Sequence, residues 1–405
     1  MRLLRLAWRN VFRQKRRTLT TLAALVIGLA GLVVFQGYLD QLMVGFRDGT
    51  IRSGIGHLQI SSDPKYFTDG EFNPFAYSLK DEQSLVKTLS ADSRVQAVFP
   101  STGFTAIGGL GDKATTLLVK AYPADRMLFG PYPPNTTGHF TLGELVAGAW
   151  NTSGPGNRLI LGETAARILR AKVGDVVTLM AILPDGGLNG RDFTVAGIYR
   201  SAGRDKIFAF TDYATAQEFT NLQAAPVLHV LAHSPDDAAA LASLVPPGHS
   251  VKTWPELATY FVQVNTMFAG FLTVIRAILL LITLFILGNT MNRIVFERMR
   301  EWGTLRAFGT KAREILELVV LEGALQGLVG ALLGIAAGFT ISLFINLAGG
   351  IPFPDGNVLR RIKVIPNDQN VWWNLIPVIL TAAVAAFLPA LRAMRLSPSE
   401  ALRCP

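Results

Sequence analysis

The sequence predicts a helical membrane domain of four transmembrane helices, with a large α+β extracytoplasmic domain inserted between helices 1 and 2. The composition is the first observation, because half of the 405 residues are hydrophobic and only 17% are charged, against about 25% in an ordinary soluble domain. Four apolar runs are the second, since each is long enough for the roughly 20 residues that cross a bilayer. The third is the long segment between the first two runs, where short strand and helix patterns alternate.

The four apolar runs predict transmembrane helices at residues 18–39, 266–292, 315–347 and 372–391. The first run carries no charge and is longer than the about 7–15 apolar residues of a signal peptide. No small-residue cleavage site follows it closely, so we expect an uncleaved signal anchor. The third run is long enough to tilt or to project beyond the bilayer.

Basic residues gather in three clusters beside these runs. They are Arg2, Arg5, Arg9, Arg13, Lys15, Arg16 and Arg17 before the first run, Arg293, Arg298, Arg300, Arg306, Lys311 and Arg313 between the second and third, and Arg392, Arg395 and Arg403 after the fourth. Four crossings put all three clusters on one side of the membrane, which the positive-inside rule identifies as the cytoplasm. Membrane topology therefore explains the net charge of +9, and no nucleic-acid partner is expected.

This topology divides the rest of the chain into cytoplasmic and extracytoplasmic parts. Residues 1–17 are expected to form a cytoplasmic amphipathic helix, residues 293–314 a cytoplasmic loop, and residues 392–405 a cytoplasmic C-terminal helix. Residues 40–265 form the large extracytoplasmic domain, and residues 348–371 an extracytoplasmic loop. The sequence has one cysteine, Cys404, so no disulfide within the chain can stabilise that domain.

The extracytoplasmic domain has patterns of both strands and helices. Alternation predicts strands at Gly56–Ile60, Val176–Leu179, Phe193–Ile198 and Lys206–Phe210, and helical periodicity predicts helices at Glu82–Leu89, Glu163–Leu169, Tyr213–Phe219 and Asp236–Leu244. The segment Asn151–Asn157 (NTSGPGN) has loop composition and is a candidate boundary between two subdomains.

A search of this domain for catalytic or metal-binding motifs finds little. His229 and His233 have the spacing of a helical metal site, but the run lacks the glutamate of H-E-x-x-H. The surrounding PVLHVLAHS favours a strand, in which positions four apart lie about 13 Å from each other. Residues 108–113 (GGLGDK) lack the spacing of a phosphate-binding loop. We expect no catalytic residue, no metal site and no cofactor on this chain.

The segment from Asn289 to Ile315 is the most informative part of the chain. Charged residues alternate there with large apolar ones, and Gly309 is expected to end the helix before the third span. One interpretation is a basic loop that lies on anionic lipid headgroups. The other is a short helix that docks on a soluble ATPase and couples it to the membrane domain.

The pattern ER-x-x-E-x-G-x-x-RA-x-G in this segment resembles the corresponding loop of the FtsX-like permeases, which include ABC transporters of the MacB and lipoprotein-release type. The matching residues are Glu297, Arg298, Glu301, Gly303, Arg306, Ala307 and Gly309. The C-terminal PALRAMRLSPSEALR is similar to the closing motif of the same family, with Pro389, Pro398 and Glu400 in place. Ser397 and Glu400 also form a capping box with proline at the first helical position, which predicts a short helix.

The resemblance implies a permease without an ATPase domain of its own. Two permease copies, identical or different, would work with a pair of cytoplasmic ATPase subunits that hold ATP and Mg. Closure of the ATPase pair would move the periplasmic domains by mechanotransmission, in the bacterial inner membrane, for lipoprotein release or export. The GHLQI run at Gly56–Ile60 resembles permeases of the lipoprotein-releasing type. The alternatives are MacB-like efflux of drugs or peptides, with a periplasmic adaptor, and FtsX-like regulation of a cell-wall hydrolase.

Several residues inside the predicted spans favour helix packing or a buried polar contact. Small residues at helical spacing allow close packing of transmembrane helices, and the candidates are Gly28 and Gly31 in the first span and Gly330, Gly334 and Gly338 in the third. Glu322 and Gln326 lie one turn apart in the third span. An ionisable residue there is either buried against a partner, usually with a function, or extends to the membrane interface. Both interpretations of Glu322 stay open.

Overall fold

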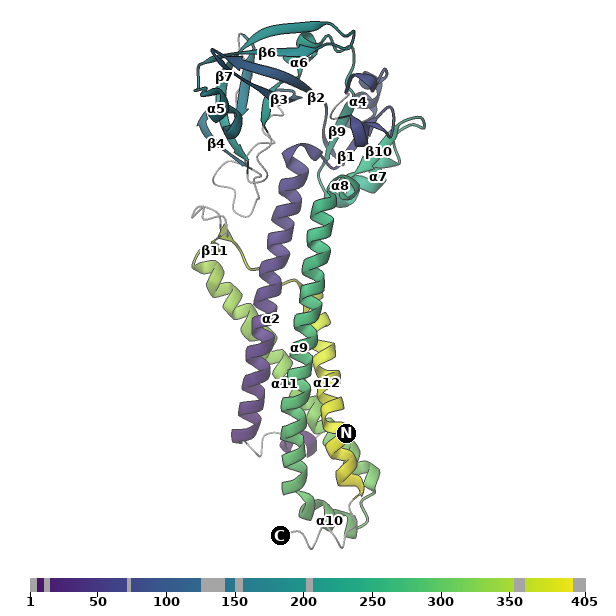
Figure 1. Ribbon diagram of the computed structural model, residues 1–405. Coiled ribbons are helices and arrows are strands. Elements are labelled where there is room, and N and C mark those ends of the chain that lie inside the picture. Colours follow the sequence, from purple (N-terminus) through teal and green to yellow (C-terminus); the bar gives the residue numbers. More distant parts are fainter. Residues whose placement is uncertain are drawn as a thin grey trace. The chain divides into compact units, whose positions relative to one another are not determined.

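The computed structural model describes residues 6–10, 15–70, 74–124, 143–149, 156–201, 207–352 and 361–395. The chain divides into two compact units (Figure 1). One is helical and comprises the described parts of 1–43 and 265–405. The other is an α/β unit built from the described parts of residues 44–264, which include the end of the first long helix and the start of the second. This arrangement confirms the predicted fold class.

Four long helices form the helical unit. They are α2 (Lys15–Thr50), α9 (Thr259–Glu297), α11 (Ala312–Leu347) and α12 (Asp368–Arg395). Each contains a stretch that is apolar enough and long enough to cross a membrane. At 1.5 Å per residue, α9 is about 58 Å long, whereas the hydrocarbon core is about 30 Å thick. The helices are longer than the predicted spans because the prediction followed only the apolar residues, and the helices continue into polar sequence.

Short elements connect the long helices. They are α10 (Met299–Ala307), β11 (Ile351–Pro352) and β12 (Arg361–Ile362), and residues 6–10 are also helical. The segment after β12 is held against the helices at two points. Asn346 makes two hydrogen bonds of 2.8 Å with the backbone of Val364. Gly37 of α2 lies so close to the backbone of Ile365 and Pro366 that an added Cβ would be 3.0 Å from the Pro366 nitrogen.

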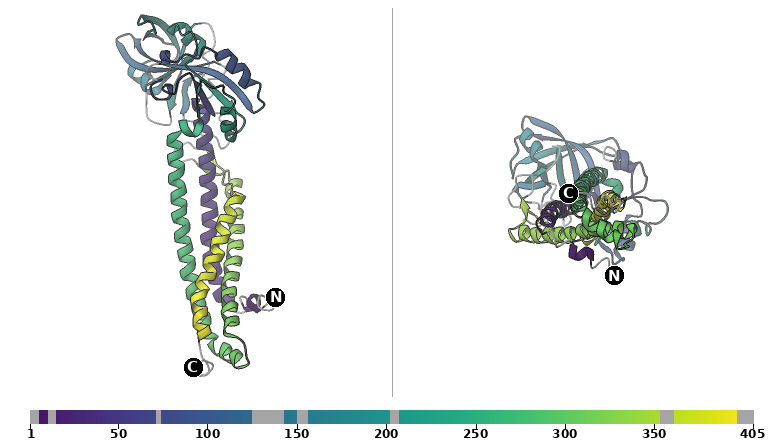
Figure 2. Two further views of the ribbon diagram at one scale, coloured as in Figure 1. Left: turned by 90° about the vertical axis from the view of Figure 1, so that its right-hand side faces the viewer. Right: turned by 90° about the horizontal axis from the view of Figure 1, so that it is seen from below.

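Glycines in the C-terminal half of α11 lie against α2. They are Gly330, Gly334 and Gly338, and the α2 residues that they meet are Leu25, Leu29 and Val33. A Cβ added to any of the three would lie 2.7 to 2.9 Å from a side-chain atom of α2. The small residues therefore allow the two backbones to approach closely. Figure 2 shows α11 beside both α2 and α12.

The N-terminal half of α11 packs closely against α12 through small residues in the same way. Gly323 and Gly327 face Ala386 and Ala382 of that helix. The two glycines that were predicted in the first span behave differently. Gly28 makes an ordinary contact with Leu279, 3.5 Å from an added Cβ, and Gly31 is exposed with no atom within 4 Å outside its own helix. Among the described residues, Gly31 therefore contributes to no packing seam.

Ten strands form the sheet of the α/β unit. They are β1 (Leu58–Ser61), β2 (Val95–Leu110), β3 (Lys113–Tyr122), β4 (Gly143–Gly148), β5 (Arg158–Gly162), β6 (Val176–Ile182), β7 (Leu188–Ser201), β8 (Phe208–Asp212), β9 (Val227–Ala232) and β10 (Ser250–Thr253). Six of them close into a barrel, because the pairs run β2-β3-β8-β5-β7-β6 and β6 pairs again with β2. Of the other four strands, β9, β1 and β10 continue from β2 in that order, and β4 pairs with β7.

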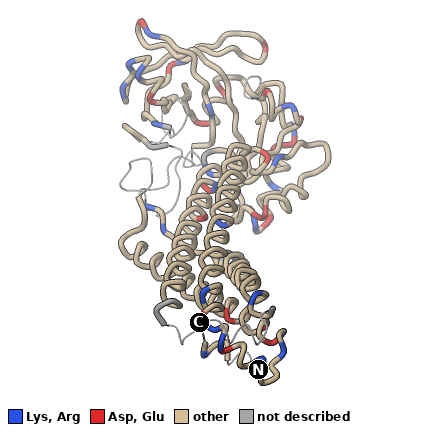
Figure 3. Tube along the Cα trace, turned by 60° about the horizontal axis from the view of Figure 1, so that its bottom comes forward, with Lys and Arg blue, Asp and Glu red and all other residues tan. Residues whose placement is uncertain are grey.

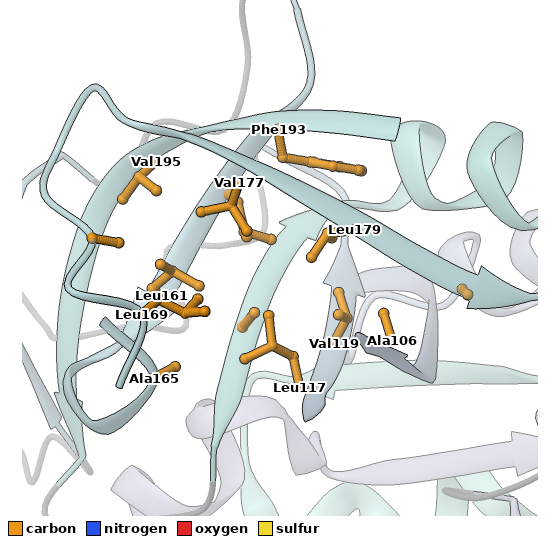
Figure 4. Packing of buried hydrophobic residues seen from close by; sticks show 14 of the residues in the cluster. Ala106, Leu117, Val119, Leu161, Ala165, Leu169, Val177, Leu179, Phe193 and Val195 are labelled. Carbon is orange, nitrogen blue, oxygen red and sulfur yellow. The ribbon is translucent and has the colours of Figure 1, made fainter. Parts of the chain in front are cut away.

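The barrel interior is an apolar core (Figure 4). Alternation along β6 turns Val177 and Leu179 inward, where they meet Phe193 of β7 and Leu117 of β3. Short helices lie between the strands along the chain. They are α3 (Tyr66–Asp69), η2 (Pro74–Ala76), α4 (Glu82–Ser90), α5 (Glu163–Leu169), α6 (Tyr213–Thr220), η4 (Pro235–Asp237), α7 (Ala238–Ala242) and α8 (Trp254–Leu257), together with the π-helix η1 (Ile51–Ile55). All the predicted strands and helices of this domain overlap elements of the same type.

The boundary between the two halves of this unit lies inside a single strand. The first part of β2, up to Ser101, pairs with β9, and the part from Thr102 onward pairs with β3 in the barrel. The prediction that Asn151–Asn157 separates two subdomains is therefore wrong, because the strands before and after it, β4 and β5, both pair with β7. Residues 151–155 themselves lie outside the described part of the chain.

Candidate coupling site

The segment with the permease-like motif forms helix α10 between α9 and α11. Arg298 interrupts the helix after α9 with φ −104° and ψ 9°. At the other end, Gly309 has φ +94°, a conformation that glycine adopts without the steric cost of a side chain. The amide of Gly309 donates to the carbonyl of Arg306 at 3.0 Å and closes the last turn. The expected helix end at Gly309 is confirmed.

One face of α10 is buried in the helical unit. Trp302 is 1% exposed, and Gly303 beside it is also buried. The indole packs in a cluster with residues of three long helices, namely Val295, Ile315, Val319, Ala390 and Ala393. Trp302 was not singled out from the sequence, although a large apolar residue in a charged helix is a signal for such an anchor. This side chain fixes which face of α10 turns outward.

The opposite face of α10 is exposed. Leu305 is 45% exposed there, beside the exposed charged residues Arg300 and Glu301, and Phe308, which directly follows α10, is 85% exposed. The seven motif residues divide between the two faces. Arg298, Gly303 and Arg306 are buried or half-buried, whereas Glu297, Glu301, Ala307 and Gly309 are exposed. The motif did not identify Leu305 or Phe308.

Arg298 joins α10 to α11 by a buried ion pair. Its Nη1 lies 3.1 Å from Oε1 of Glu322 and 3.4 Å from Oε2. Its Nε donates to Glu301 at 3.1 Å, and its guanidinium carbon lies 5.5 Å from the centre of the Trp302 ring. The Arg298 side chain is 15% exposed and that of Glu322 is 3% exposed. Glu322 is therefore buried against a partner.

The N-terminal helical residues meet the same carboxylate. Asn10 Nδ2 donates to Glu322 Oε1 at 2.5 Å, and Ala7, fully buried, packs against Leu318 and Leu325 of α11. Gln326, one turn further along α11, is 2% exposed, and its Oε1 has no hydrogen-bond partner among the described residues. The structure thus brings Asn10, Arg298 and Glu322 together, and sequence analysis had no signal for Asn10.

The end of α12 completes the site. Arg306 Nη1 donates to the carbonyl of Met394 at 3.2 Å, and Arg392 Nη1 donates to Asn292 of α9 at 3.1 Å. Pro389 of the predicted C-terminal motif is buried within α12. The other motif residues, Ser397, Pro398 and Glu400, lie outside the described residues. Figure 3 shows charged residues gathered at this end of the helical unit.

Comparison with known proteins places the two units in known families. Residues 18–246 match the model of the MacB-like periplasmic core domain, and residues 273–398 match that of the FtsX-like permease C-terminal domain. The chain is 22% identical to the lipoprotein-releasing system transmembrane protein LolE of Haemophilus influenzae, over 94% of this chain and 91% of that one. It is 22% identical to the uncharacterized ABC transporter permease YvrN of Bacillus subtilis, over 99% of this chain and 98% of that one.

A third relative matches over a shorter stretch. The macrolide export ATP-binding/permease protein MacB of Psychrobacter arcticus is 34% identical, over 28% of this chain and 16% of that protein. Because the MacB-like core model covers more than half of the sequence, and the FtsX-like model covers the helices that follow it, the chain belongs to the FtsX-like permease family with a MacB-like periplasmic core domain, and is an ABC transporter permease of the LolC/LolE and MacB type.

Proposed function

We propose that this chain is the permease subunit of a lipoprotein-releasing transporter in the bacterial inner membrane, driven by a separate ATPase through mechanotransmission. The observation that carries the proposal is the outer face of α10. Two large apolar side chains, Leu305 of α10 and Phe308 directly after it, are exposed beside charged residues, at the end of the unit where charge gathers. Exposed apolar side chains rimmed by polar ones mark sites of protein interaction.

A docking helix must transmit force, and the buried face of α10 is suited to that task. Trp302 holds α10 against α9, α11 and α12, and the ion pair of Arg298 and Glu322 adds a second attachment. A push on Phe308 would therefore move the long helices and would not simply bend a loop. In this proposal α9, which runs from α10 to the α/β unit, carries the movement to the periplasmic domain.

The membrane topology of the proposal follows the basic residues. Both termini and α10 lie in the cytoplasm, and the α/β unit lies in the periplasm, as the positive-inside rule requires. ATP and Mg are held by the partner ATPase pair. A second permease copy, identical or different, completes the transporter.

Lipoproteins are the proposed substrate because the similarity to LolE extends over nearly the whole length of both chains. The similarity to MacB covers only 16% of that protein. MacB-like efflux of drugs or peptides is the competing function, and FtsX-like regulation of a cell-wall hydrolase is a third.

Copurification tests the ATPase partner. The chain would be isolated in mild detergent from its native host, and the bound proteins identified by mass spectrometry, for the wild type, Leu305→Asp and Phe308→Asp. We expect an ABC ATPase with the wild type and its loss from both variants. Leu188→Asp is the matched control, because Leu188 is 70% exposed on β7 of the other unit. Retention of the ATPase by both α10 variants would contradict docking on this face.

Reconstitution tests the substrate. The complex would be placed in proteoliposomes with an acylated lipoprotein, and the lipoprotein released into the soluble fraction would be measured with and without ATP. ATP-dependent release supports the proposal. No release, together with ATP hydrolysis that macrolides or peptides stimulate, would instead establish the efflux function.

A further inference from the structure

We propose that Glu322 is a positioning residue that holds the coupling helix α10 and the N-terminal helical residues 6–10 in one fixed arrangement, so that both move as a unit when the ATPase acts. This inference rests on the proposed function for its role in transport. The arrangement itself stands on the contacts of Glu322 and can be tested without the ATPase.

Glu322 lies where the charged part of α11 meets its apolar part. The residues from Gly323 to Leu347 carry no charge and are long enough to cross the hydrocarbon core. Glu322 is thus the last charge of α11 before the apolar part begins, and it is 3% exposed. A carboxylate with so little exposure is stable only with charged or hydrogen-bonding partners. Its partners are therefore a structural requirement of this site.

The partners of Glu322 come from two other elements of the chain. Arg298 belongs to the interruption between α9 and α10, and Asn10 belongs to the N-terminal helical residues. Both donate to the same oxygen, Oε1 of Glu322. Loss of this one carboxylate would therefore release two cytoplasmic elements at once.

The backbone at Arg298 departs from helical geometry, although the amide of Arg298 still donates to the carbonyl of Ile294 and the amide of Trp302 to the carbonyl of Arg298. Side-chain contacts around Arg298 add to these hydrogen bonds in fixing the direction of α10 relative to α9. The planar guanidinium of Arg298 binds Glu322 through Nη1 and Glu301 through Nε while it lies near the ring of Trp302. Lysine has the charge but not this fork of donors.

A distance measurement between the two elements tests the inference. Spin labels would be attached at Leu6→Cys and Thr304→Cys in a Cys404→Ser background, since Cys404 is the sole cysteine. Leu6 is 50% exposed and Thr304 is exposed on α10. The permease would be measured alone and with its ATPase by pulsed electron paramagnetic resonance. We expect one narrow distance distribution for the wild type and a broad one for Glu322→Gln.

The matched control is Glu317→Gln. Glu317 lies on the same helix and pairs with Arg313, but its side chain is 45% exposed. We expect its distance distribution to equal that of the wild type. A distribution for folded Glu322→Gln as narrow as the wild type would overturn the inference. If Glu322→Gln does not fold, Asn10→Ala removes only one of the contacts and should still broaden the distribution. A narrow distribution in that variant would overturn the inference equally.

A second readout separates positioning from simple stabilisation. In proteoliposomes, we expect Glu322→Gln to retain the bound ATPase but to release about tenfold less lipoprotein per ATP hydrolysed. Arg298→Lys should act similarly, and the double variant should be no worse than either single one, because both remove the same interaction. Independent, additive losses would contradict the shared role. Absence of the ATPase from the wild type would refute the proposed function, while the label distances would still decide the arrangement.

Discussion

The hydroxyl of Ser101 and Nε2 of His229 lie 2.6 Å apart in the interior of the α/β unit. The other ring nitrogen, Nδ1, lies 3.1 Å from the carbonyl oxygen of Ile55. A carbonyl only accepts, so Nδ1 carries the hydrogen and Nε2 accepts from Ser101. The imidazole is stacked on Phe99, with ring centres 5.3 Å apart. His229 thereby fastens η1, the segment that follows α2, to strands β2 and β9, and both of its nitrogens are occupied.

These contacts predict a loss of stability in mild acid. Burial lowers the pKa of His229 to about 4, and burial, followed by the nearby Arg52, lowers the pKa of His57 to about 4. Both values lie below the usual value of about 6.5 in an unfolded chain. Between pH 6.5 and 4 the unfolded chain therefore binds more protons than the folded one. The stabilisation that the two neutral histidines contribute is complete above pH 6.5 and is lost as the pH falls towards 4.

Thermal unfolding of the full-length chain in detergent, followed by tryptophan fluorescence from pH 7.5 to 4, measures this dependence. Each neutral histidine contributes a slope of about 1.4 kcal/mol per pH unit to the free energy of unfolding within that window. His229→Gln should make the slope shallower. His249→Gln is the control, because His249 makes exposed contacts with Asp81 and the Pro246 carbonyl. An equal slope for wild type and His229→Gln would contradict the assignment.

The close contact between α2 and α11 predicts a low tolerance for side chains at the glycine seam. Gly330→Leu would place atoms where Leu25 already lies, since even a Cβ would be 2.7 Å from Leu25 Cδ1. We expect a loss of about 1–3 kcal/mol in stability from overpacking. Gly31→Ala is the control, and because Gly31 has open space it should be neutral or stabilise by up to about 1 kcal/mol. Melting temperatures in detergent would compare the two.

Trp302 on the buried face of α10 and Phe308, which directly follows α10, should affect different properties when each is replaced by alanine. Trp302→Ala removes a side chain that is 1% exposed and should cost about 3–5 kcal/mol of stability. Phe308→Ala removes one that is 85% exposed and should leave the stability unchanged while it weakens ATPase binding. Thermal unfolding and copurification would be measured on both variants. A large loss of stability in Phe308→Ala would mean that this residue is packed within the permease.

The segment after β12 lies so close to Gly37 of α2 that its position requires a residue without a side chain there. Gly37→Ala would push a Cβ against the backbone of Ile365 and Pro366. Because backbone atoms cannot move aside as a side chain can, we expect the segment to separate from α2. Hydrogen exchange at the amide of Val364, which donates to Asn346, should then increase. Unchanged exchange at this amide would show that the close approach is not retained in the membrane.

The fold class could be predicted because its signals are local. Apolar runs without charge identify helices, and alternation such as that at Val176–Leu179 identifies a strand. The barrel could not be predicted, since its closure depends on β2 pairing with β6 across a long stretch of sequence. The subdomain boundary inside β2 was missed for a related reason, because a continuous strand shows no change in composition at Ser101.

The candidate site was predictable only in part. The motif identified the location of α10 but not the division of its residues between a buried and an exposed face. That division depends on Trp302 packing against α11 and α12. The partner of Glu322 could not be identified, because Arg298 and Asn10 are distant in the sequence and meet it only through helix packing. An ionisable residue in a predicted span indicates that it has a partner, but the sequence does not show which residue that partner is.

The measurement that tests the central claim most directly is photo-crosslinking in living cells. A photoreactive amino acid would replace Phe308, and another would replace Leu188 as the control, after which crosslinked peptides would be identified by mass spectrometry. If Phe308 docks on the ATPase, we expect a crosslink from position 308 to the surface of an ABC ATPase and none from position 188. Crosslinks from position 308 to lipids alone, in cells that make the transporter, would contradict it and would show that α10 lies on the membrane surface.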